Sequence, residues 1–325
     1  MIVPQYWAEG RAKARQDKQQ VTVRRFGWSD ISQEDAQQQA NARSQEALQR
    51  ILSGVKLDRS EPKISYNGAA GVPIREEVVE RHGETVITRN SYGARCLNTP
   101  NVLFADIDFQ TTPTFQFIAA IVLTTLAAAI VIGWYSHSTL VWAALLIFIV
   151  MASRPLAGLL YSRIHGTADD MVKAARERVR GLSSTHPEWG SRLYRTPAGV
   201  RVLVTHRPFQ PNEPEVRECF QALRVDPLFA QMCLNQQCFR ARVSPKPWRI
   251  GIPDHMRPRP GIWPVAPERM PLRQRWIDRY ESMAVSFSAC SFLESVGADT
   301  IHPVVAPVLR LHDDLSKAAS GLPIA

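Results

Sequence analysis

Two aspartates are the residues of this sequence whose types and spacing most suggest chemistry. Asp106 and Asp108 close the apolar run "NVLFADIDF". In an extended strand, residues two apart point to the same face, so we expect the two carboxylates to project together. Like charges this close are costly unless a cation or an arginine neutralises them. The pair therefore predicts either a Mg²⁺ or Mn²⁺ site, as used in phosphoryl transfer, or a pair of salt-bridged surface aspartates.

Basic residues gather in the second half of the chain, with aromatic residues between them. The stretch from Arg163 to Arg275 has 20 Lys and Arg against 10 Asp and Glu, so it carries +10 while the whole chain carries +9. Arginines beside flat rings suit phosphates and bases, although a cytoplasmic surface next to an anionic leaflet has the same composition. The candidate phosphate-binding residues are Arg195, Arg201, Arg240, Arg242, Lys246 and Arg249, and the candidate catalytic residues are Asp106, Asp108 and His206.

Two long apolar stretches separate these groups of residues. Phe115 to Tyr135 is 21 residues without a charge, and Leu140 to Tyr161 is 22 residues with Arg154 near its end. At about 1.5 Å per residue, each spans roughly the 30 Å of a bilayer's hydrocarbon core. The alternative is a pair of buried helices in a soluble core. The pattern favours two transmembrane helices joined by the short turn "SHST".

The distribution of charge predicts the orientation of this hairpin. The turn has no Lys or Arg, whereas arginines and a lysine crowd the end of the second span and the segment after it, from Arg154 to Arg180. By the positive-inside rule, the turn faces outward and both flanks are cytoplasmic. The N-terminal segment lacks the apolar run of a signal peptide. We therefore expect a bacterial inner-membrane protein with cytoplasmic termini.

The flanking segments predict a mixed domain. "VTVRRFGW" alternates like a strand, and Ser32 is a suitable cap for a helix that ends near Gly54. Later, "TPAG" is a suitable turn between two strands, and a basic helix is expected to end at Gly181. The predicted class is α+β, with one cytoplasmic domain interrupted by the inserted membrane hairpin. Its expected parts are residues 1–113, 114–162 and 163–325.

The five cysteines are scattered and include no CxxC pair. This pattern predicts free thiols in a reducing compartment rather than a disulfide framework. Cys233 and Cys238 could form half of a zinc site, but no second pair of Cys or His follows at a suitable spacing.

Two motifs together carry a family resemblance. "VLFADIDF" followed by "YRTPAGVRVLVTH" resembles the catalytic domain of the archaeo-eukaryotic primase superfamily, the primase-polymerases. The resemblance implies that Asp106 and Asp108 bind metal and that the strand after the turn Thr196–Gly199 faces nucleotide phosphates. "VLFADI" is also similar to the opening metal strand of class III nucleotide cyclases, without the glycine-phenylalanine that follows there. The chain as a whole resembles uncharacterised transmembrane proteins of proteobacteria.

The sequence departs from the primase pattern at two points. Arg201 occupies the position of the family's histidine, and His206 comes five residues later. A third acid is not evident, and Asp254 and Asp278 are candidates by order alone.

Three classes of function fit these features. The first is a metal-dependent enzyme that transfers phosphoryl or nucleotidyl groups to or from a nucleotide or nucleic acid. The second is a non-catalytic, membrane-tethered interaction or scaffold protein. The third is an enzyme of lipid headgroups, since Asp108 lies within about 25 Å of extended chain from the first span. The bilayer is the partner common to all three.

Overall fold

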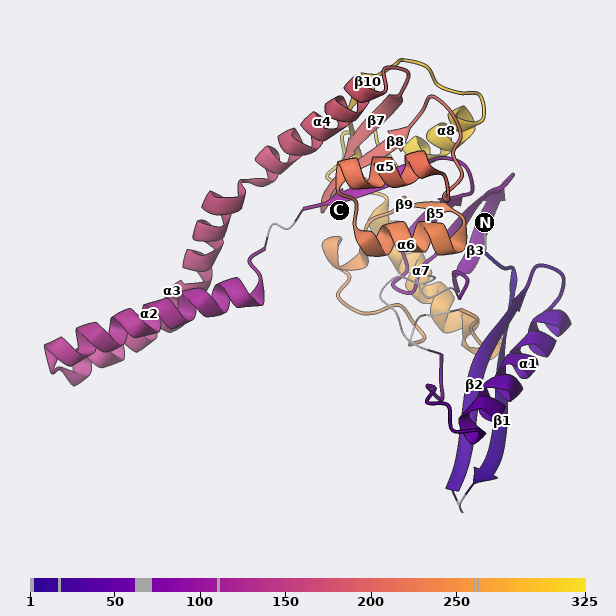
Figure 1. The fold of residues 1–325 in the computed structure, drawn as a ribbon, viewed down its shortest axis with the longest axis horizontal. Helices are drawn as coiled ribbons and strands as arrows, with labels where there is room; N and C mark the ends of the chain where they lie inside the picture. The colour runs from indigo at the N-terminus through magenta and orange to yellow at the C-terminus, as the bar shows by residue number, and fades with distance from the viewer. Residues whose placement is uncertain (1–2, 17–18, 62–71, 110–111, 260, 262) are drawn as a thin grey trace. The chain divides into compact units, whose positions relative to one another are not determined.

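The computed structural model describes residues 3–16, 19–61, 72–109, 112–259, 261 and 263–325. They divide into two compact units, of which the larger combines Met1–Ile107 with Val179–Ala325 and the smaller is Asp108–Arg178. The larger unit contains three sheets with helices packed on them (Figure 1), which confirms the predicted α+β class. The smaller unit extends beyond the expected segment 114–162 at both ends.

The first described elements form a long antiparallel hairpin covered by one helix. β1 (Tyr6–Gln16) pairs with β2 (Gln19–Ser29), and α1 (Gln33–Leu52) lies along the pair (Figure 1). The helix begins where predicted, because the Ser32 hydroxyl accepts a hydrogen bond from the N–H of Asp35 at 3.1 Å. Such a cap satisfies one of the free N–H groups of the first turn.

Small residues let α1 approach this hairpin closely. A Cβ atom on Gly27 would lie 2.2 Å from the backbone nitrogen of Ala40, and one on Gly10 would lie 2.2 Å from the Ala40 carbonyl oxygen. Ala36 and Ala40 are completely buried at this contact. Strand backbone therefore meets helix backbone directly, which glycine permits because it has no side chain.

Two carbonyl groups of β1 are occupied by side chains of α1. The amides of Gln33 and Gln37, one helical turn apart, donate to the carbonyl oxygens of Trp7 and Glu9 at 2.9 and 3.3 Å. These bonds occupy backbone acceptors that an added strand would otherwise use.

Two N–H groups of β2 are occupied in a similar way. The N–H of Arg24 donates to the Arg59 carbonyl at 2.8 Å, and the N–H of Phe26 donates to the Glu61 carboxylate at 3.1 Å. The segment that follows α1 thus returns along β2 without forming a strand of its own.

The second sheet joins segments from both sides of the smaller unit. Its order is β3–β4–β5–β9, and all neighbours are antiparallel. β5 precedes the smaller unit in sequence and β9 follows it, so the two segments of the chain complete one sheet. The strands are β3 (Glu77–His82), β4 (Thr85–Arg89), β5 (Arg95–Thr99) and β9 (Phe239–Arg242).

Helices pack on this sheet from the later part of the chain. Phe220 of α5 (Pro214–Leu223) contacts Phe229 of α6 (Pro227–Gln236) and Phe239 of β9. The break between α5 and α6 spans Arg224 to Asp226, and Pro227 is the first residue of α6. A third helix, α7 (Met270–Ala284), is held by ion pairs that are described with the candidate site.

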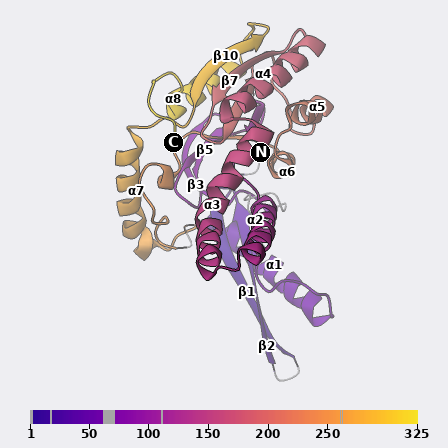
Figure 2. The ribbon, with the colours of Figure 1, turned by 90° about the vertical axis from the view of Figure 1, so that its left-hand side faces the viewer.

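The third sheet has the order β10–β7–β8–β6 and carries the helix α8. β7 and β8 form the predicted hairpin, in which the backbones of Thr196 and Gly199 exchange hydrogen bonds at 2.9 and 3.3 Å. Figure 2 shows β10 beside β7. The elements are β6 (Phe104–Asp108), β7 (Gly190–Arg195), β8 (Gly199–Val204), β10 (Ser291–Gly297) and α8 (Val305–Ser316).

One predicted helix end is wrong. α4 (Ala168–Thr185) continues through Gly181, which was expected to terminate it. The buried side chains of Val179 and Leu182 flank this glycine. Their burial outweighs the cost of about 1 kcal/mol for a glycine inside a helix.

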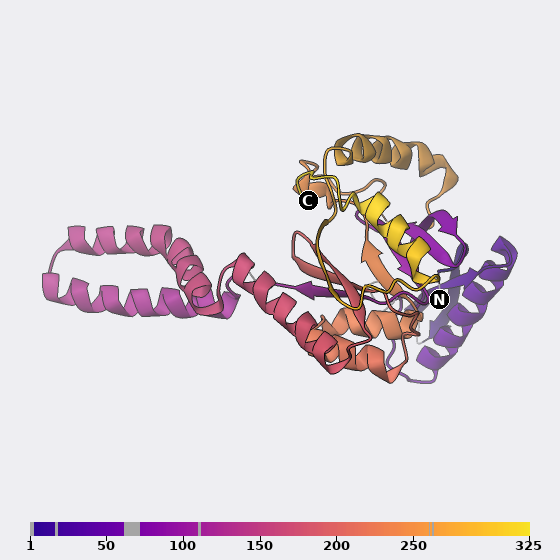
Figure 3. The same ribbon diagram turned by 90° about the horizontal axis from the view of Figure 1, so that it is seen from above.

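The smaller unit is built around a hairpin of apolar helices. α2 (Phe115–Ser136) and α3 (Thr139–His165) run side by side (Figure 3). The connection turns at His137, whose backbone is left-handed with a φ of 49°. A Cβ atom on Gly133 would lie 2.3 Å from the Trp142 ring, so the two helices are in close contact near the turn.

The two helices differ as candidates for crossing a membrane. Among the described residues, α2 is the helix that is long and apolar enough to cross by itself. The second expected span lies in α3, which meets the same criterion only when Thr139–Ile149 is joined across a bend of 47° to Met151–Thr185, a segment that continues to the end of α4. Insertion of both helices as a transmembrane hairpin therefore stays a prediction.

Candidate functional site

The first candidate acid, Asp106, is held by an arginine from a neighbouring strand. Arg201 of β8 donates from Nε to Asp106 Oδ1 at 2.7 Å and from Nη2 to Oδ2 at 3.0 Å. The arginine side chain is 2% exposed and the aspartate side chain is 30% exposed. Such a two-point pair is the strongest arrangement of these groups, because both N–H donors meet both oxygens.

The remaining donor of Arg201 connects this pair to the interior. Its Nη1 donates to the carbonyl of Arg242 at 2.8 Å and lies 3.3 Å from His312 Nε2. Burial alone would lower the pKa of Arg201, but the ion pair with Asp106 raises it above its ordinary value. The guanidinium is therefore permanently charged and bridges β6, β8, β9 and α8.

His312 continues the buried network. Its side chain is completely buried, and Nδ1 lies 3.0 Å from Asp313 Oδ1. Burial lowers the pKa of His312, Arg201 acts in the same direction, and Asp313 opposes them. Asp313 in turn accepts from Arg192 at 3.1 Å. His312, Asp313 and Arg192 were not singled out in the sequence, because α8 reaches β8 only through the fold.

The fit of a metal ion can be judged from the same geometry. Both oxygens of Asp106 already accept hydrogen bonds from Arg201, so a cation would have to displace a buried arginine. Asp108 is exposed at the end of β6. Within the part of the chain that the structure describes, no three His, Cys, Asp or Glu side chains are grouped so as to hold a metal. In this arrangement the residues do not fit Mg²⁺ or Mn²⁺, and the metal site stays a prediction.

The structure does not connect His206 with the acidic pair. Its ring centroid lies 5.1 Å from that of Trp189, with the two planes tilted by 31°, and the ring meets Phe209 edge-on at 5.4 Å. Burial lowers the pKa of His206, and the nearby Arg207 acts in the same direction. No hydrogen bond or ion pair between His206 and Asp106 is found in the described structure.

Two candidate phosphate-binding arginines are used within the fold. Arg240 donates to both oxygens of Glu76 at 2.8 and 2.7 Å and to Asn98 at 3.0 Å. Arg195 donates to the carbonyl of Gly199 at 2.9 Å, which braces the β7–β8 turn.

The other candidates lie on and after β9. Nε of Arg242 is buried and has no hydrogen-bond partner among the described residues. Lys246 lies over the ring of Trp248, with Nζ 5.4 Å from its centroid, and Tyr92 meets the same ring edge-on at 5.2 Å. Arg249 is in the short 3₁₀ helix Pro247–Arg249. Trp248 is 54% exposed, so an aromatic surface adjoins these cations.

The candidates for a third acid are engaged elsewhere. Asp254 pairs with Arg279, and Asp278 accepts from the amide of Gln274 at 2.7 Å. The hydrogen bond from Arg279 lowers the pKa of Asp254.

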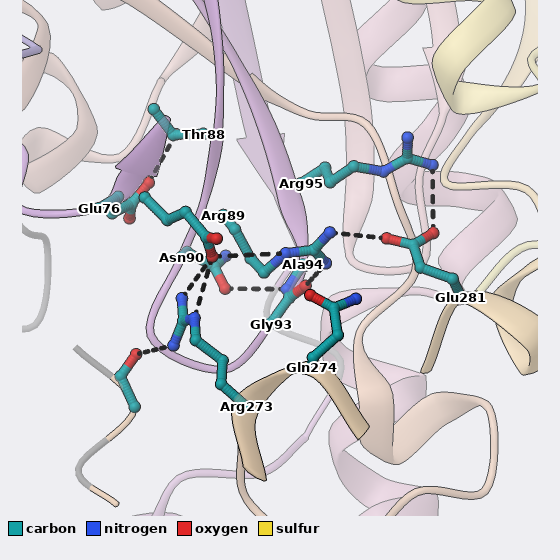
Figure 4. A network of polar contacts seen from close by, with 12 residues as sticks. Glu76, Thr88, Arg89, Asn90, Gly93, Ala94, Arg95, Arg273, Gln274 and Glu281 are labelled. Carbon is teal, nitrogen blue, oxygen red and sulfur yellow. Dashed lines mark hydrogen bonds and ion pairs between the residues drawn. The ribbon is translucent and has the colours of Figure 1, made fainter. Parts of the chain in front are cut away.

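A second polar network, absent from the sequence predictions, fastens α7 to the second sheet (Figure 4). Arg89 and Arg95 reach the two carboxylate oxygens of Glu281 at 2.9 and 3.6 Å. Arg273, which is completely buried, donates to Glu77 at 2.7 Å. These pairs join residues far apart in sequence, so spacing alone gave no sign of them.

Compared with protein-family models, with curated proteins and with solved structures, the chain has no match. The function is therefore inferred from the geometry of the chain itself.

Proposed function

We propose that this protein is a non-catalytic interaction protein tethered to the bacterial inner membrane, with its larger unit in the cytoplasm. The observation that carries the proposal is the outward-facing apolar surface of α2. Leu123 and Trp134 are 65% and 73% exposed, and the buried positions are Ala129 and Gly133. An apolar surface of this length is stable when lipid covers it.

The second helix supports insertion as a hairpin. Leu146, Phe148 and Leu159 of α3 are each more than half exposed, although α3 packs on α2. The connecting turn contains no Lys or Arg, whereas Arg163 lies in the last turn of α3. The positive-inside rule then favours an external turn and cytoplasmic flanks.

The pairing of Asp106 supports a binding role rather than metal chemistry. Both of its oxygens stabilise the buried Arg201, and Arg201 also holds the Arg242 carbonyl. A carboxylate committed in this way neutralises a charge that would be costly to bury alone. Removal of the Asp106 carboxylate would therefore destabilise the fold, whether or not a substrate is bound.

Fractionation and topology mapping test the tether. The full chain should sediment with membranes and resist extraction at alkaline pH. A reporter enzyme active only in the periplasm should give a signal when fused at His137 and none at either terminus. Extraction of intact protein by alkaline carbonate would contradict the tether, and reporter signal at the termini would contradict the orientation.

One observation favours a second candidate function, the binding of a phosphate-bearing ligand beside β9. The buried Nε of Arg242 has no acceptor among the described residues. Burial raises the pKa of Tyr92, whereas Arg242 lowers it, which places the phenol within electrostatic reach of the arginine. A phosphate could accept from Arg242 while a flat ring stacks on the exposed Trp248.

Titration of the tryptophan fluorescence, without metal, tests this ligand site. ATP, inorganic phosphate and glycerol phosphate serve as probes of a nucleotide, a bare anion and a lipid headgroup. Arg242→Gln should abolish saturable quenching, and the exposed Arg217→Gln should not. Preference for ATP supports a nucleotide ligand and preference for glycerol phosphate supports a headgroup. Absence of saturation in the unmodified chain, or equal loss in both variants, would contradict the site.

A further inference from the structure

The face of the β1–β2 hairpin that turns away from α1 changes character along its length. Near Ser29, Trp7 lies opposite Trp28, with ring centroids 5.7 Å apart. Farther along the strands, Arg11 lies directly opposite Arg24. The aromatic end of this face thus gives way to a cationic end.

The cationic end is exposed to solvent. Arg11, Lys13 and Arg15 alternate along β1 and are all exposed, as is Arg24 on β2. Glu9 is the acidic side chain on the described part of this face, and it accepts from Nε of Arg11 at 2.6 Å. We call the four basic side chains the ribbon strip.

The ribbon strip lowers the stability of the hairpin. Like charges directly opposite each other on neighbouring strands are destabilising. A face designed only for solubility would mix the two signs, and Arg24 has no acid opposite it. The cations recur every second residue, about 6.8 Å apart along β1. Such a row of one sign suits a partner that presents a row of the opposite sign.

The surroundings of the strip limit how a partner can bind. The carbonyls of Trp7 and Glu9 and the N–H groups of Arg24 and Phe26 are already occupied. The opposite face is covered by α1. At these positions a partner therefore meets the exposed face of the hairpin rather than adding a strand to it.

We propose that the ribbon strip binds the phosphates of double-stranded nucleic acid. A two-stranded ribbon, with strands about 4.8 Å apart, enters a major groove about 12 Å wide. The strip itself consists of phosphate-contacting cations, which read no base edge, and Gln20 opposite Arg15 is the amide side chain on the described strands of this face, so binding is mainly independent of sequence. A lipid surface fits less well, because interfacial binders combine cations with large exposed apolar side chains, whereas Trp7 at the aromatic end is 2% exposed. The inference names a partner class for the interaction role proposed above and rests on it.

Binding to a fluorescent 30-base-pair DNA duplex tests the proposal. The full chain is held in nanodiscs of zwitterionic lipid, so that no anionic lipid competes. The ribbon variant replaces Lys13, Arg15 and Arg24 with Gln, and the control variant replaces the exposed Arg217, Arg269 and Arg310 with Gln. Both variants lose three charges, so they differ only in where the charge is lost.

The ribbon variant should weaken binding at least tenfold and make the negative slope of log K against log salt shallower by about three, one for each lost phosphate contact. The control variant should bind nearly as well as the unmodified chain. Equal losses in the two variants would overturn the proposal, as would no binding by the unmodified chain. Weakened association with nanodiscs of anionic lipid, with DNA binding unchanged, would assign the strip to the membrane instead. Membrane fractionation is measured separately, so failure of the tether is distinguishable from failure of the strip.

Discussion

The two units differ in which groups they bury and which they expose to solvent. The larger unit buries charge, since Arg201 and Arg273 are 2% and 0% exposed, and it pairs each with a carboxylate. The smaller unit exposes apolar surface, with Leu123 of α2 at 65%. A buried charge is tolerated only with its partner, and an extended apolar surface only with a covering. The larger unit therefore supplies its own compensation, whereas the smaller unit requires a different solvent.

The largest change in stability is expected at the buried ion pair between Asp106 and Arg201 in the larger unit. Asp106→Asn should lower the free energy of unfolding by about 3 to 5 kcal/mol, because it leaves Arg201 as an uncompensated buried charge. Asp108→Asn should change stability less than Asp106→Asn, because Asp108 is exposed at the end of β6. Urea unfolding of both variants in one detergent measures the difference. Metal-dependent stabilisation of the unmodified chain, lost equally in both variants, would restore the metal interpretation.

A charge placed on each unit sharpens the contrast between them. Leu123→Arg should disfavour insertion by about 2.5 to 3.5 kcal/mol, since an arginine at the centre of a spanning helix must be desolvated. Ile31, in the larger unit, is 82% exposed, and Ile31→Arg should have almost no effect. The fraction of protein that resists carbonate extraction reports the outcome. Equal behaviour of the two variants would mean that α2 does not lie in lipid.

Adding one methyl group should change the stability of the larger unit in opposite directions at two glycines, one in β2 and one in α4. Gly27→Ala should destabilise the larger unit by about 1 to 3 kcal/mol, because the added carbon meets the α1 backbone at Ala40. Gly181→Ala in α4 meets open space and should stabilise by up to about 1 kcal/mol. Thermal unfolding of the two variants in the same buffer gives the signs. A neutral Gly27→Ala would show that α1 can shift without cost.

The smallest effect should be the dependence of stability on pH at His312. Burial lowers its pKa, so between the folded value and about 6.5 the unfolded chain binds a proton that the folded chain does not. Stability is therefore unaffected above about pH 6.5 and falls below it, by at most about 1.4 kcal/mol per pH unit. His312→Gln should flatten this slope, whereas the exposed His255→Gln should not. An unchanged slope in the first variant would place the titration elsewhere.

Local features of the fold were accessible from the sequence because their causes lie within a few residues. The cap at Ser32 and the turn Thr196–Gly199 depend on neighbouring atoms, and both formed as predicted. β1 was missed because its helix-facing positions are Ala8, Gly10 and Ala12, which give no apolar alternation although they are buried. Small residues can mark a close contact, but only the partner helix makes that evident.

The candidate site was accessible only in part. The sequence placed Asp106 and Asp108 on a strand, which is correct, and left open whether a metal or an arginine would meet them. The choice depends on β8 lying beside β6, which brings together residues 95 positions apart. No periodicity encodes that neighbour, and the same holds for His312 on α8.

The occupied backbone groups at the sides of the β1–β2 hairpin have a consequence for crowding. Proteins confined to a membrane share a thin layer, so copies of one chain meet far more often than they would in the cell's volume. An unprotected strand at such density would recruit the same strand of a neighbour and propagate into a fibre. Gln33 and Gln37 on one side and Arg59 and Glu61 on the other occupy four backbone groups that a neighbouring copy would need to extend the sheet at these positions. Dense arrays of this protein should therefore remain collections of separate molecules.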